Sequence, residues 1–303
     1  MQRRATPEDA GARLDAFLAA PLGSRARAQR LIEAGHVLVD GRAAPKRHLL
    51  SAGELVTVDE PEETPAPDAP DAPYAVPYSD EHLLVVDKPA GVVVHPARGH
   101  RTGTLAQALS PIAAGGEDAA RAGIVHRLDR DTSGLLVVAR SEAVHRALRN
   151  ALQARAITRE YLALVEGRPP ARSGTIDAPL GRDRRVRTRM STDSDDPRAA
   201  VTHFEIEQAL PRTTLLRVRL ETGRTHQIRA HLRAIDHPVV GDPEYGTPGR
   251  LGLERQFLHA ARLAFAHPVT GAPIDVSSPL PDRAGDSGEL TAEDLDVSVV
   301  AAP

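Results

Sequence analysis

The sequence is organised around the stretch Gly123-Ile-Val-His-Arg-Leu-Asp-Arg-Asp-Thr-Ser-Gly-Leu-Leu-Val-Val-Ala-Arg140. Apolar residues at its two ends have the composition of buried strands, and the middle is polar and charged. This pattern predicts a rigid sheet that presents a loop holding Asp129 and Asp131 beside Arg127 and Arg130. A carboxylate with a cation close by stays ionised, so it suits a nucleophile or a general base rather than an acid. A loop of surface ion pairs, which contribute little, is the alternative that this stretch alone leaves open.

The segments on either side of this loop have the patterns of strands and of a few short helices. Their order is irregular, and no strict strand-helix-strand repeat is present. We therefore expect an α+β domain around a mixed, mostly antiparallel sheet rather than a doubly wound parallel one. Strand patterns occupy residues 83–88, 91–96, 135–139, 161–165 and 215–220, and helical patterns occupy 142–153 and 225–234.

The composition shifts twice along the chain, and these shifts predict the domain boundaries. Residues 60–77 are rich in Pro and acid without apolar periodicity, which is typical of an extended, semi-rigid linker. The linker separates a small domain at 11–59 from a large domain at 78–281. The acidic residues 282–303 are expected to be a disordered tail.

The charge of the folded part differs from that of the whole chain. Residues 60–73 and 282–303 each carry a net charge of −5, so removing both from the net −3 leaves +7 on the rest. A polyanionic partner is therefore plausible. The absence of cysteine excludes disulfides and thiolate metal sites and fits a cytoplasmic protein. No apolar run approaches the roughly 20 residues that span a bilayer, so we expect no membrane partner.

The small domain has the pattern of two helices and a short sheet. A first helix is predicted over 13–18 and a second over 24–33, with Ser24 as N-cap and Gly35 as C-cap. Arg25, Arg27 and Arg30 cluster on the second helix, where they are either solvated or bind RNA. The whole pattern resembles the S4 RNA-binding domain. The matching segments are Arg13-Leu14-Asp15, Ser24-Arg25, Leu31-Ile32, Gly35-His36-Val37, Val39-Asp40-Gly41 and Gly53-Glu54, the last with Glu where Asp is usual.

Five blocks of the large domain, in order, resemble the RluA/RluD-type pseudouridine synthases. The central block is His126-Arg127-Leu128-Asp129 with Thr132-Ser133-Gly134-Leu135. The other four blocks are Asp87-Lys88-Pro89-Ala90-Gly91 with His95-Pro96; Arg159-Glu160-Tyr161 to Gly167, where Lys is commoner than Arg159; Thr222 to Arg229 with His231-Leu232, Pro238 and Gly241-Asp242; and Leu258-His259-Ala260 with Phe265 and His267-Pro268.

The resemblance implies a role for four residues. Asp129 would act at the C1′ region of the ribose while the glycosidic bond of uracil breaks and the base rejoins through carbon. Tyr161 would stack on the uracil, and Arg224 would pair with Asp129 and hold it ionised. Arg127 would enter the space left by the flipped nucleotide. The reaction is an isomerisation, so the resemblance implies no cofactor and no metal.

Two further features bear on RNA and metal binding. The basic run from Arg182 to Arg189 includes Arg184, Arg185 and Arg187, which are either a solvated loop or contacts to RNA phosphates. His226 and His231 are five residues apart, which is not the spacing of a helical metal-binding pair. We expect these two histidines to serve helix packing or phosphate contact.

The sequence as a whole predicts a monomeric, cytoplasmic RNA pseudouridine synthase. Its substrate is expected to be structured RNA, in the first place large-subunit ribosomal RNA or a ribosome precursor. One alternative is a non-catalytic RNA-binding or ribosome-assembly factor that retains the fold. Another is a nucleoside hydrolase, which needs a second carboxylate as acid. Asp131 is the only nearby candidate for that carboxylate, and it lacks an apolar setting that would raise its pKa.

Overall fold

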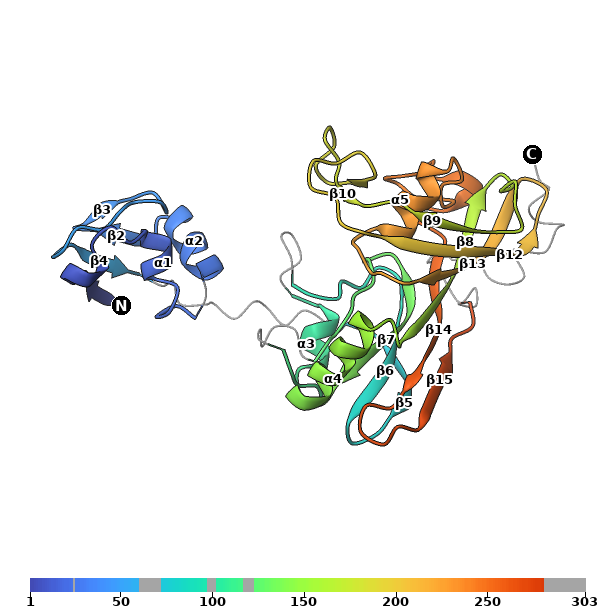
Figure 1. The fold of residues 1–303 in the computed structure, drawn as a ribbon, viewed down its shortest axis with the longest axis horizontal. Helices are drawn as coiled ribbons and strands as arrows, with labels where there is room; N and C mark the ends of the chain where they lie inside the picture. The colour runs from blue at the N-terminus through green and yellow to red at the C-terminus, as the bar shows by residue number, and fades with distance from the viewer. Residues whose placement is uncertain (24, 60–71, 97–101, 117–122, 281–303) are drawn as a thin grey trace. The chain divides into compact units, whose positions relative to one another are not determined.

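The computed structural model describes residues 1–303 except 24, 60–71, 97–101, 117–122 and 281–303 (Figure 1). The chain divides into two compact units, Met1–Asp68 and Ala69–Pro303. The predicted N-cap Ser24, most of the predicted linker and the predicted tail lie outside the described residues.

The N-terminal unit is a small sheet packed against two helices. Its four strands have the order β1-β4-β2-β3 and are antiparallel. Leu14, Leu18 and Val56 are among the buried residues of its core. The unit begins before residue 11, the predicted start, because β1 pairs with β4. Its elements are β1 (Gln2–Arg4), a 3-10 turn (Pro7–Asp9), α1 (Leu14–Phe17), α2 (Arg25–Glu33), β2 (Val37–Val39), β3 (Arg42–Ala43) and β4 (Leu55–Val58).

A buried carboxylate joins the two helices of this unit. Asp15 is fully buried and accepts hydrogen bonds from the side chains of Arg13, Arg25 and Gln29. The hydrogen bonds from Arg13 in particular, together with those from Arg25, hold the pKa of Asp15 well below its usual range. The guanidinium of Arg25, predicted to contact RNA, is therefore engaged within the protein.

The C-terminal unit is built on a nine-stranded mixed sheet, which confirms the predicted α+β class. The strand order is β5-β6-β7-β14-β8-β13-β12-β9, with β15 paired to β14. Only the short β14–β7 pairing is parallel among these pairs. The strands are β5 (Ala75–Ser79), β6 (Leu83–Lys88), β7 (Ser133–Ala139), β8 (Thr158–Glu166), β9 (Ser173–Asp177), β12 (Val201–Ala209), β13 (Thr213–Leu220), β14 (Leu258–Ala266) and β15 (Pro273–Ser277).

The remaining elements of this unit are short helices and one small hairpin. They are α3 (Leu105–Leu109), α4 (Glu142–Gln153), α5 (Gln227–Ala234), a 3-10 turn (Arg250–Gly252), and the hairpin of β10 (Gly181–Arg182) and β11 (Met190–Ser191). Helix α4 has the predicted bounds, and α5 begins two residues later than predicted. Among the described residues, no helix is both long and apolar enough to cross a membrane.

Two expectations for the start of this unit are wrong. Residues 75–77, predicted as linker, form part of β5, an edge strand that tolerates Pro77 beside an irregularity in the pairing with β6. Residues 91–96, predicted as a strand or as a turn followed by a strand, form no strand. Val92 and Val94 are buried there, but the carbonyl of Val92 accepts a hydrogen bond from the Lys88 ammonium rather than from a neighbouring strand.

Strand β7 is buried on both faces and therefore gives the loop before it a rigid base. Leu136 and Val138 belong to the core cluster on one face, and Leu135 and Val137 to the cluster on the other. Helix α4 covers the second face through residues such as Leu148, and Figure 1 shows it beside β7. Successive side chains of a strand point to opposite faces of the sheet, so a continuous apolar run contributes to the core on each face.

Candidate active site

The loop that carries Asp129 is anchored to the sheet at several points. The Lys88 ammonium, fully buried at the end of β6, donates hydrogen bonds to the backbone carbonyls of Pro89, Val92 and Arg130. Three carbonyl acceptors match the three N–H donors of an ammonium. Burial lowers the pKa of Lys88 to about 7, against the opposing charges of Asp131 and Asp129. Lys88 thus ties the loop to the segment after β6.

Gly134 allows the chain to enter β7 in contact with β14. Its φ is +108°, and an added Cβ would lie 2.3 Å from the carbonyl oxygen of Ala260. Ser133 next to it bonds His259 Nδ1 at 3.0 Å, and both side chains are buried. The Thr132-Ser133-Gly134 segment therefore fastens the loop to β14 and fixes where Asp129 emerges.

Asp129 pairs with a buried arginine from α5. Arg229 Nη1 donates to Asp129 Oδ2 at 3.0 Å, and the Arg229 side chain is only 5% exposed. The same guanidinium donates two hydrogen bonds to Asp242, at 2.6 and 2.9 Å, and one to Glu244 at 3.0 Å. Burial acts to lower the pKa of Arg229, but the bonds to Asp242 and Asp129 outweigh it and raise the pKa above its ordinary value. A permanent cation thus holds the Asp129 carboxylate.

The expected pairing of Arg224 with Asp129 is wrong. Arg224 precedes α5 and is exposed, and its Nε donates to the carbonyl of Ala199 at 3.1 Å. The cause is the side chain of Gln227, whose Oε1 accepts from the Arg224 backbone N–H and from Thr222. These bonds fold residues 222–224 into a turn before the helix begins. The arginine that reaches Asp129 is therefore Arg229, inside the helix.

The two histidines of this block have different surroundings. His231 is buried, and its ring nitrogens bond Thr202 Oγ1 and the Ala178 carbonyl, both at 2.9 Å. It serves packing, one of the two expected roles. His226 lies 3.9 Å from Asp129 through Nε2. Burial lowers the pKa of His226, although the charge of Asp129 opposes this. The described residues contain no group of three or more His, Cys, Asp or Glu side chains that could hold a metal ion.

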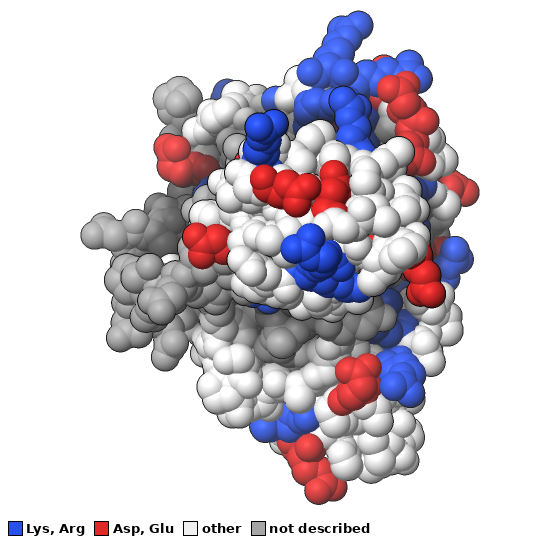
Figure 2. Space-filling model, turned by 90° about the vertical axis from the view of Figure 1, so that its left-hand side faces the viewer, with Lys and Arg blue, Asp and Glu red and all other residues white. Residues whose placement is uncertain are grey.

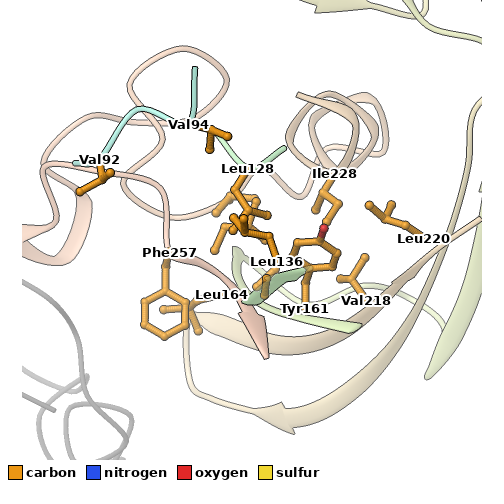
Figure 3. Close-up of a cluster of buried hydrophobic side chains, with 14 of the residues drawn as sticks. Val92, Val94, Leu128, Leu136, Tyr161, Leu164, Val218, Leu220, Ile228 and Phe257 are labelled. Carbon is orange, nitrogen blue, oxygen red and sulfur yellow. The ribbon is translucent and has the colours of Figure 1, made fainter. Parts of the chain in front are cut away.

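Tyr161 lies on β8 beneath the loop. Its side chain packs with Leu128, Val218 and Ile228, and the residue is 5% exposed. Figure 3 shows the ring between β-strand residues, with the hydroxyl oxygen pointing towards Ile228 on α5. Burial raises the pKa of Tyr161, so the hydroxyl keeps its proton at neutral pH. Within the described part of the chain, this hydroxyl makes no hydrogen bond, and it remains available to a ligand.

The predicted RNA-contacting arginines of the C-terminal unit are exposed. Arg127, Arg185 and Arg187 have exposed side chains, whereas Arg184 is engaged with Asp193 and Asp195 at 3.0 and 2.8 Å. Figure 2 shows Lys and Arg side chains gathered at the top of the view, the height at which Figure 1 places β10, with acidic side chains beside them. The tip of this hairpin also exposes Val186.

The arginines of α2 that were predicted to contact RNA differ in their surroundings. Arg25 binds Asp15, as described above. The side chain of Arg27 is exposed. The side chain of Arg30 lies outside the described residues.

A cavity of about 470 Å³ lies next to the Arg229 cluster but does not include Asp129. It is lined in part by Arg189, Arg233, His237, Glu244 and Tyr245. Glu244 and Tyr245 are shared with the surroundings of Arg229 and His226. Asp129 and Tyr161 do not line this cavity. The placement of the candidate active site at Asp129 therefore rests on the contacts of Asp129 and not on the cavity.

Four residues of the site had no predicted role there: Lys88, Arg229, Asp242 and Glu244. All of them lie in or beside the sequence blocks that resemble the pseudouridine synthases. The sequence therefore showed their place along the chain but did not predict which side chains they contact. The available signal was the helical pattern of residues 225–234, in which Arg229 stands between the apolar Ile228 and Ala230. A charged residue among apolar ones on a short helix marks a buried ion pair.

Comparison with known proteins identifies two regions of the chain. Residues 82–234 match the family model for RNA pseudouridylate synthase, and residues 12–56 match that for the S4 domain. The protein named ribosomal large subunit pseudouridine synthase D of Xanthomonas campestris pv. campestris is 46% identical over 289 residues, covering 90% of this chain and 87% of that relative. An uncharacterized RNA pseudouridine synthase of Chloroflexus aurantiacus is 49% identical over 284 residues, covering 91% and 88%.

A solved structure also resembles this chain. Human RNA pseudouridylate synthase domain containing 1 aligns with a TM-score of 0.55 at 25% identity and covers 77% of this chain and 96% of that one. Sequence and fold therefore point to the same group of proteins.

Proposed function

The chain belongs to the RNA pseudouridylate synthase family and carries an S4 domain, and on this premise we propose that it converts uridines of large-subunit ribosomal RNA to pseudouridine. The observation that carries the proposal is the ion pair between the Asp129 carboxylate and the buried Arg229, above Tyr161. The ribosomal target is supported by relatives named ribosomal large subunit pseudouridine synthase D at 41–46% identity.

The reaction is an isomerisation whose atoms balance within the nucleotide. The N1–C1′ bond breaks, the uracil turns, a C5–C1′ bond forms, C5 loses its proton and N1 gains one. No electrons are gained or lost, so we propose that no redox cofactor takes part, and we assign no metal to the site. The protein has to extract the base from its stack, stabilise the separated fragments and hold them while the base turns.

Asp129 acts at the ribose in this proposal. A carboxylate paired with Arg229 can attack the sugar or stabilise the positive charge that develops at C1′ when the glycosidic bond breaks. Arg229 is locked by Asp242 and Glu244, so it holds one Asp129 oxygen, Oδ2, and makes no bond to the other, Oδ1.

Tyr161 and Arg127 handle the base in this proposal. The buried ring of Tyr161 provides an apolar surface for uracil, and its protonated hydroxyl is a donor without a protein partner in the described part of the chain. Arg127 is exposed two residues before Asp129, where it can fill the place of the extracted nucleotide. Arg224 keeps a place at the edge of the site, where it would contact the RNA backbone.

The arginines outside the site would bind the RNA backbone. We propose that Arg25, Arg27 and Arg30 of α2 contact phosphates, and that Arg184, Arg185 and Arg187 of the β10–β11 hairpin do so as well. The S4 domain supports structured RNA as the partner. A monomer acting in the cytoplasm is consistent with this proposal.

The test is Asp129→Asn, with Asp131→Asn as the matched control. Asp131 pairs with Arg130 on the exposed side of the same loop, at 2.9 Å. We expect Asp129→Asn to abolish pseudouridine formation in ribosomal RNA while RNA affinity changes less than about threefold, and Asp131→Asn to keep most activity. Mapping of pseudouridine in cells with and without the gene identifies the uridines. A wild-type protein that binds RNA but modifies none would indicate the non-catalytic alternative.

A further inference from the structure

The two carboxylate oxygens of Asp129 differ in their hydrogen bonding. Oδ2 accepts a hydrogen bond from Arg229, whereas Oδ1 accepts none from the described residues. The group that faces Oδ1 is His226 Nε2, at 3.9 Å. That distance is too long for a hydrogen bond, but catalytic contacts are often long in a free enzyme and shorten when substrate binds. Whether His226 offers Oδ1 a proton or a lone pair depends on its tautomer.

The backbone of the hairpin determines which way the Tyr245 hydroxyl points. Met190 N–H, at the start of β11, donates to the Tyr245 oxygen at 2.7 Å. Burial raises the pKa of Tyr245 to about 12, so the hydroxyl keeps its own proton and needs an acceptor. His226 Nδ1 lies 3.0 Å from the Tyr245 oxygen and is a suitable acceptor. In that arrangement the proton of a neutral His226 resides on Nε2, facing Asp129.

The opposite tautomer satisfies fewer groups. With its proton on Nδ1, His226 would donate to the Tyr245 oxygen, and the Tyr245 O–H would then find no acceptor in the described part of the chain. A buried donor without a partner is costly. Glu244 Oε2 is 3.4 Å from Nδ1, farther than the Tyr245 oxygen at 3.0 Å, so the Tyr245 hydroxyl is the nearer partner of Nδ1. The hydrogen-bond geometry therefore favours the tautomer with its proton on Nε2.

The backbone at His226 is held in an uncommon conformation. His226, directly before α5, has a φ of +53°, which lies in the left-handed region that residues other than glycine rarely adopt. The ring meets Tyr245 edge-on, with centroids 5.7 Å apart and an interplanar angle of 86°. A strained backbone conformation persists only where surrounding contacts hold it. Here the contact of His226 with Tyr245 holds the ring with Nε2 towards Asp129.

We propose that His226 is a positioning residue for Asp129, presenting an Nε2–H to Oδ1 in a tautomer set by the Tyr245 hydroxyl. Arg229 and His226 then orient the carboxylate from both oxygens, so that it meets the ribose at one angle. Tyr245 connects this arrangement to the base of the β10–β11 hairpin through Met190. The inference rests on the proposed function for its kinetic consequence, but the tautomer itself is observable without any substrate.

The first experiment determines the tautomer of His226 in the full-length protein. Two-bond ¹H–¹⁵N correlation spectra at pH 8 distinguish a protonated Nε2 from a protonated Nδ1, and the His226→Gln variant assigns the signals by their loss. We expect a protonated Nε2 in the wild type and a population with protonated Nδ1 in Tyr245→Phe. A wild-type ring protonated on Nδ1 overturns the proposal, whatever the enzyme does to RNA.

The second experiment measures single-turnover rates and RNA affinity on a ribosomal RNA fragment. Partners that orient an active ligand typically matter by about 10–100-fold. We expect His226→Leu to slow the reaction by about that factor, with RNA affinity changed less than about twofold. His226→Gln restores an N–H near the Nε2 position and should lie within about fivefold of wild type. Equal reductions of the single-turnover rate in His226→Leu and His226→Gln would contradict the positioning role. An unchanged rate in His226→Leu would contradict it as well.

Tyr78→Phe is the matched control for Tyr245→Phe. The Tyr78 hydroxyl also makes a 2.7 Å hydrogen bond, to Asp80, at a place that belongs to no part of the site. We expect Tyr245→Phe to slow turnover by about tenfold and Tyr78→Phe to leave both turnover and the His226 signals unchanged. Equal slowing in the two variants would show a general loss of stability. If no variant and no wild-type sample modifies RNA, the proposed function fails and the spectra still decide the tautomer.

Discussion

Arg229 donates from Nη1 to Oδ2 of Asp129 at 3.0 Å, across a sequence separation of one hundred residues. The guanidinium is 5% exposed and is shared with Asp242 and Glu244. An ion pair in this environment is screened far less by salt than one on the surface. The contact joins the loop before β7 to helix α5, so the position of the Asp129 carboxylate depends on how these two parts of the C-terminal unit pack.

Lysine substitution should distinguish Arg229 from Arg224. Arg229→Lys keeps the charge but loses the planar fork that binds Asp129, Asp242 and Glu244 together, so we expect single-turnover rates to fall by about 100-fold or more. Arg224→Lys should cost less than about fivefold, because Arg224 is exposed and bonds only a backbone carbonyl in the described part of the chain. The release of tritium from the C5 position of labelled uridine in the same RNA measures both rates. The reverse ranking would return the pairing role to Arg224 in the substrate complex.

Removal of the Tyr161 hydroxyl should separate chemistry from packing. The hydroxyl makes no hydrogen bond in the described structure, so Tyr161→Phe should change the free energy of unfolding by less than about 1 kcal/mol. We expect the turnover rate to fall nonetheless, since in the proposed function the hydroxyl donates a hydrogen bond to the bound base. Tyr161→Leu also removes the ring and should destabilise the domain by about 2–4 kcal/mol. Urea unfolding combined with single-turnover assays tests this, and full activity of the Phe variant would exclude a role for the hydroxyl.

The buried ring of His126 should make the domain sensitive to acid. Burial, with the charge of Arg159, lowers the pKa of His126 in the folded state to about 3, whereas the unfolded value is 6.5. His126 Nε2 accepts the Val137 N–H, so the folded state favours the neutral ring. Above pH 6.5 neither state binds the proton, and the ring adds no pH dependence. As pH falls from 6.5 towards 3, the unfolded state alone binds it, and stability decreases.

His126→Gln removes this titration. The difference in unfolding free energy between wild type and His126→Gln should be constant above pH 6.5 and shift in favour of the variant, by up to a few kcal/mol, as pH falls towards 3. Urea unfolding at pH 8, 6, 5 and 4 measures it. A difference that stays constant over the whole range would mean that His126 titrates alike in both states.

The N-terminal unit should contribute phosphate contacts without being needed for chemistry. Ala72 and Tyr74 pack in the core of the C-terminal unit, so a truncation that removes residues 1–68 preserves that core, whereas removal of 1–75 would not. We expect the truncated protein to fold and modify short RNA. Its affinity for large RNA should be lower and depend less steeply on salt, because each phosphate contact adds to that dependence. Binding of both proteins at several salt concentrations tests this, and identical slopes would contradict phosphate contacts by the S4 domain.

Much of the architecture follows from local patterns in the sequence. The apolar runs that became β6 and β7 were predicted as strands, and both strands contribute side chains to the cores on both faces of the sheet. The patterns at 161–165 and 215–220 were also predicted as strands, and they form parts of β8 and β13. Helix α4 has the bounds predicted for it, and in the structure the Ser141 side chain caps it by accepting a hydrogen bond from the Val144 N–H. The failures fall where non-local contacts decide, as at residues 91–96, which give the Val92 carbonyl to Lys88 instead of to a strand.

The sequence by itself determined the family, the fold class and the position of Asp129, because these depend on residue types in a fixed order along the chain. Only the tertiary structure decided which arginine reaches Asp129. Arg224 and Arg229 lie in the same block, and the choice depends on where α5 begins, which the side chain of Gln227 sets through its bonds to residues 222–224. The surroundings of His226 were also beyond the sequence, since Met190, Tyr245 and Asp129 meet there from three separate segments. Contacts of this kind follow from packing in three dimensions, which no local pattern encodes.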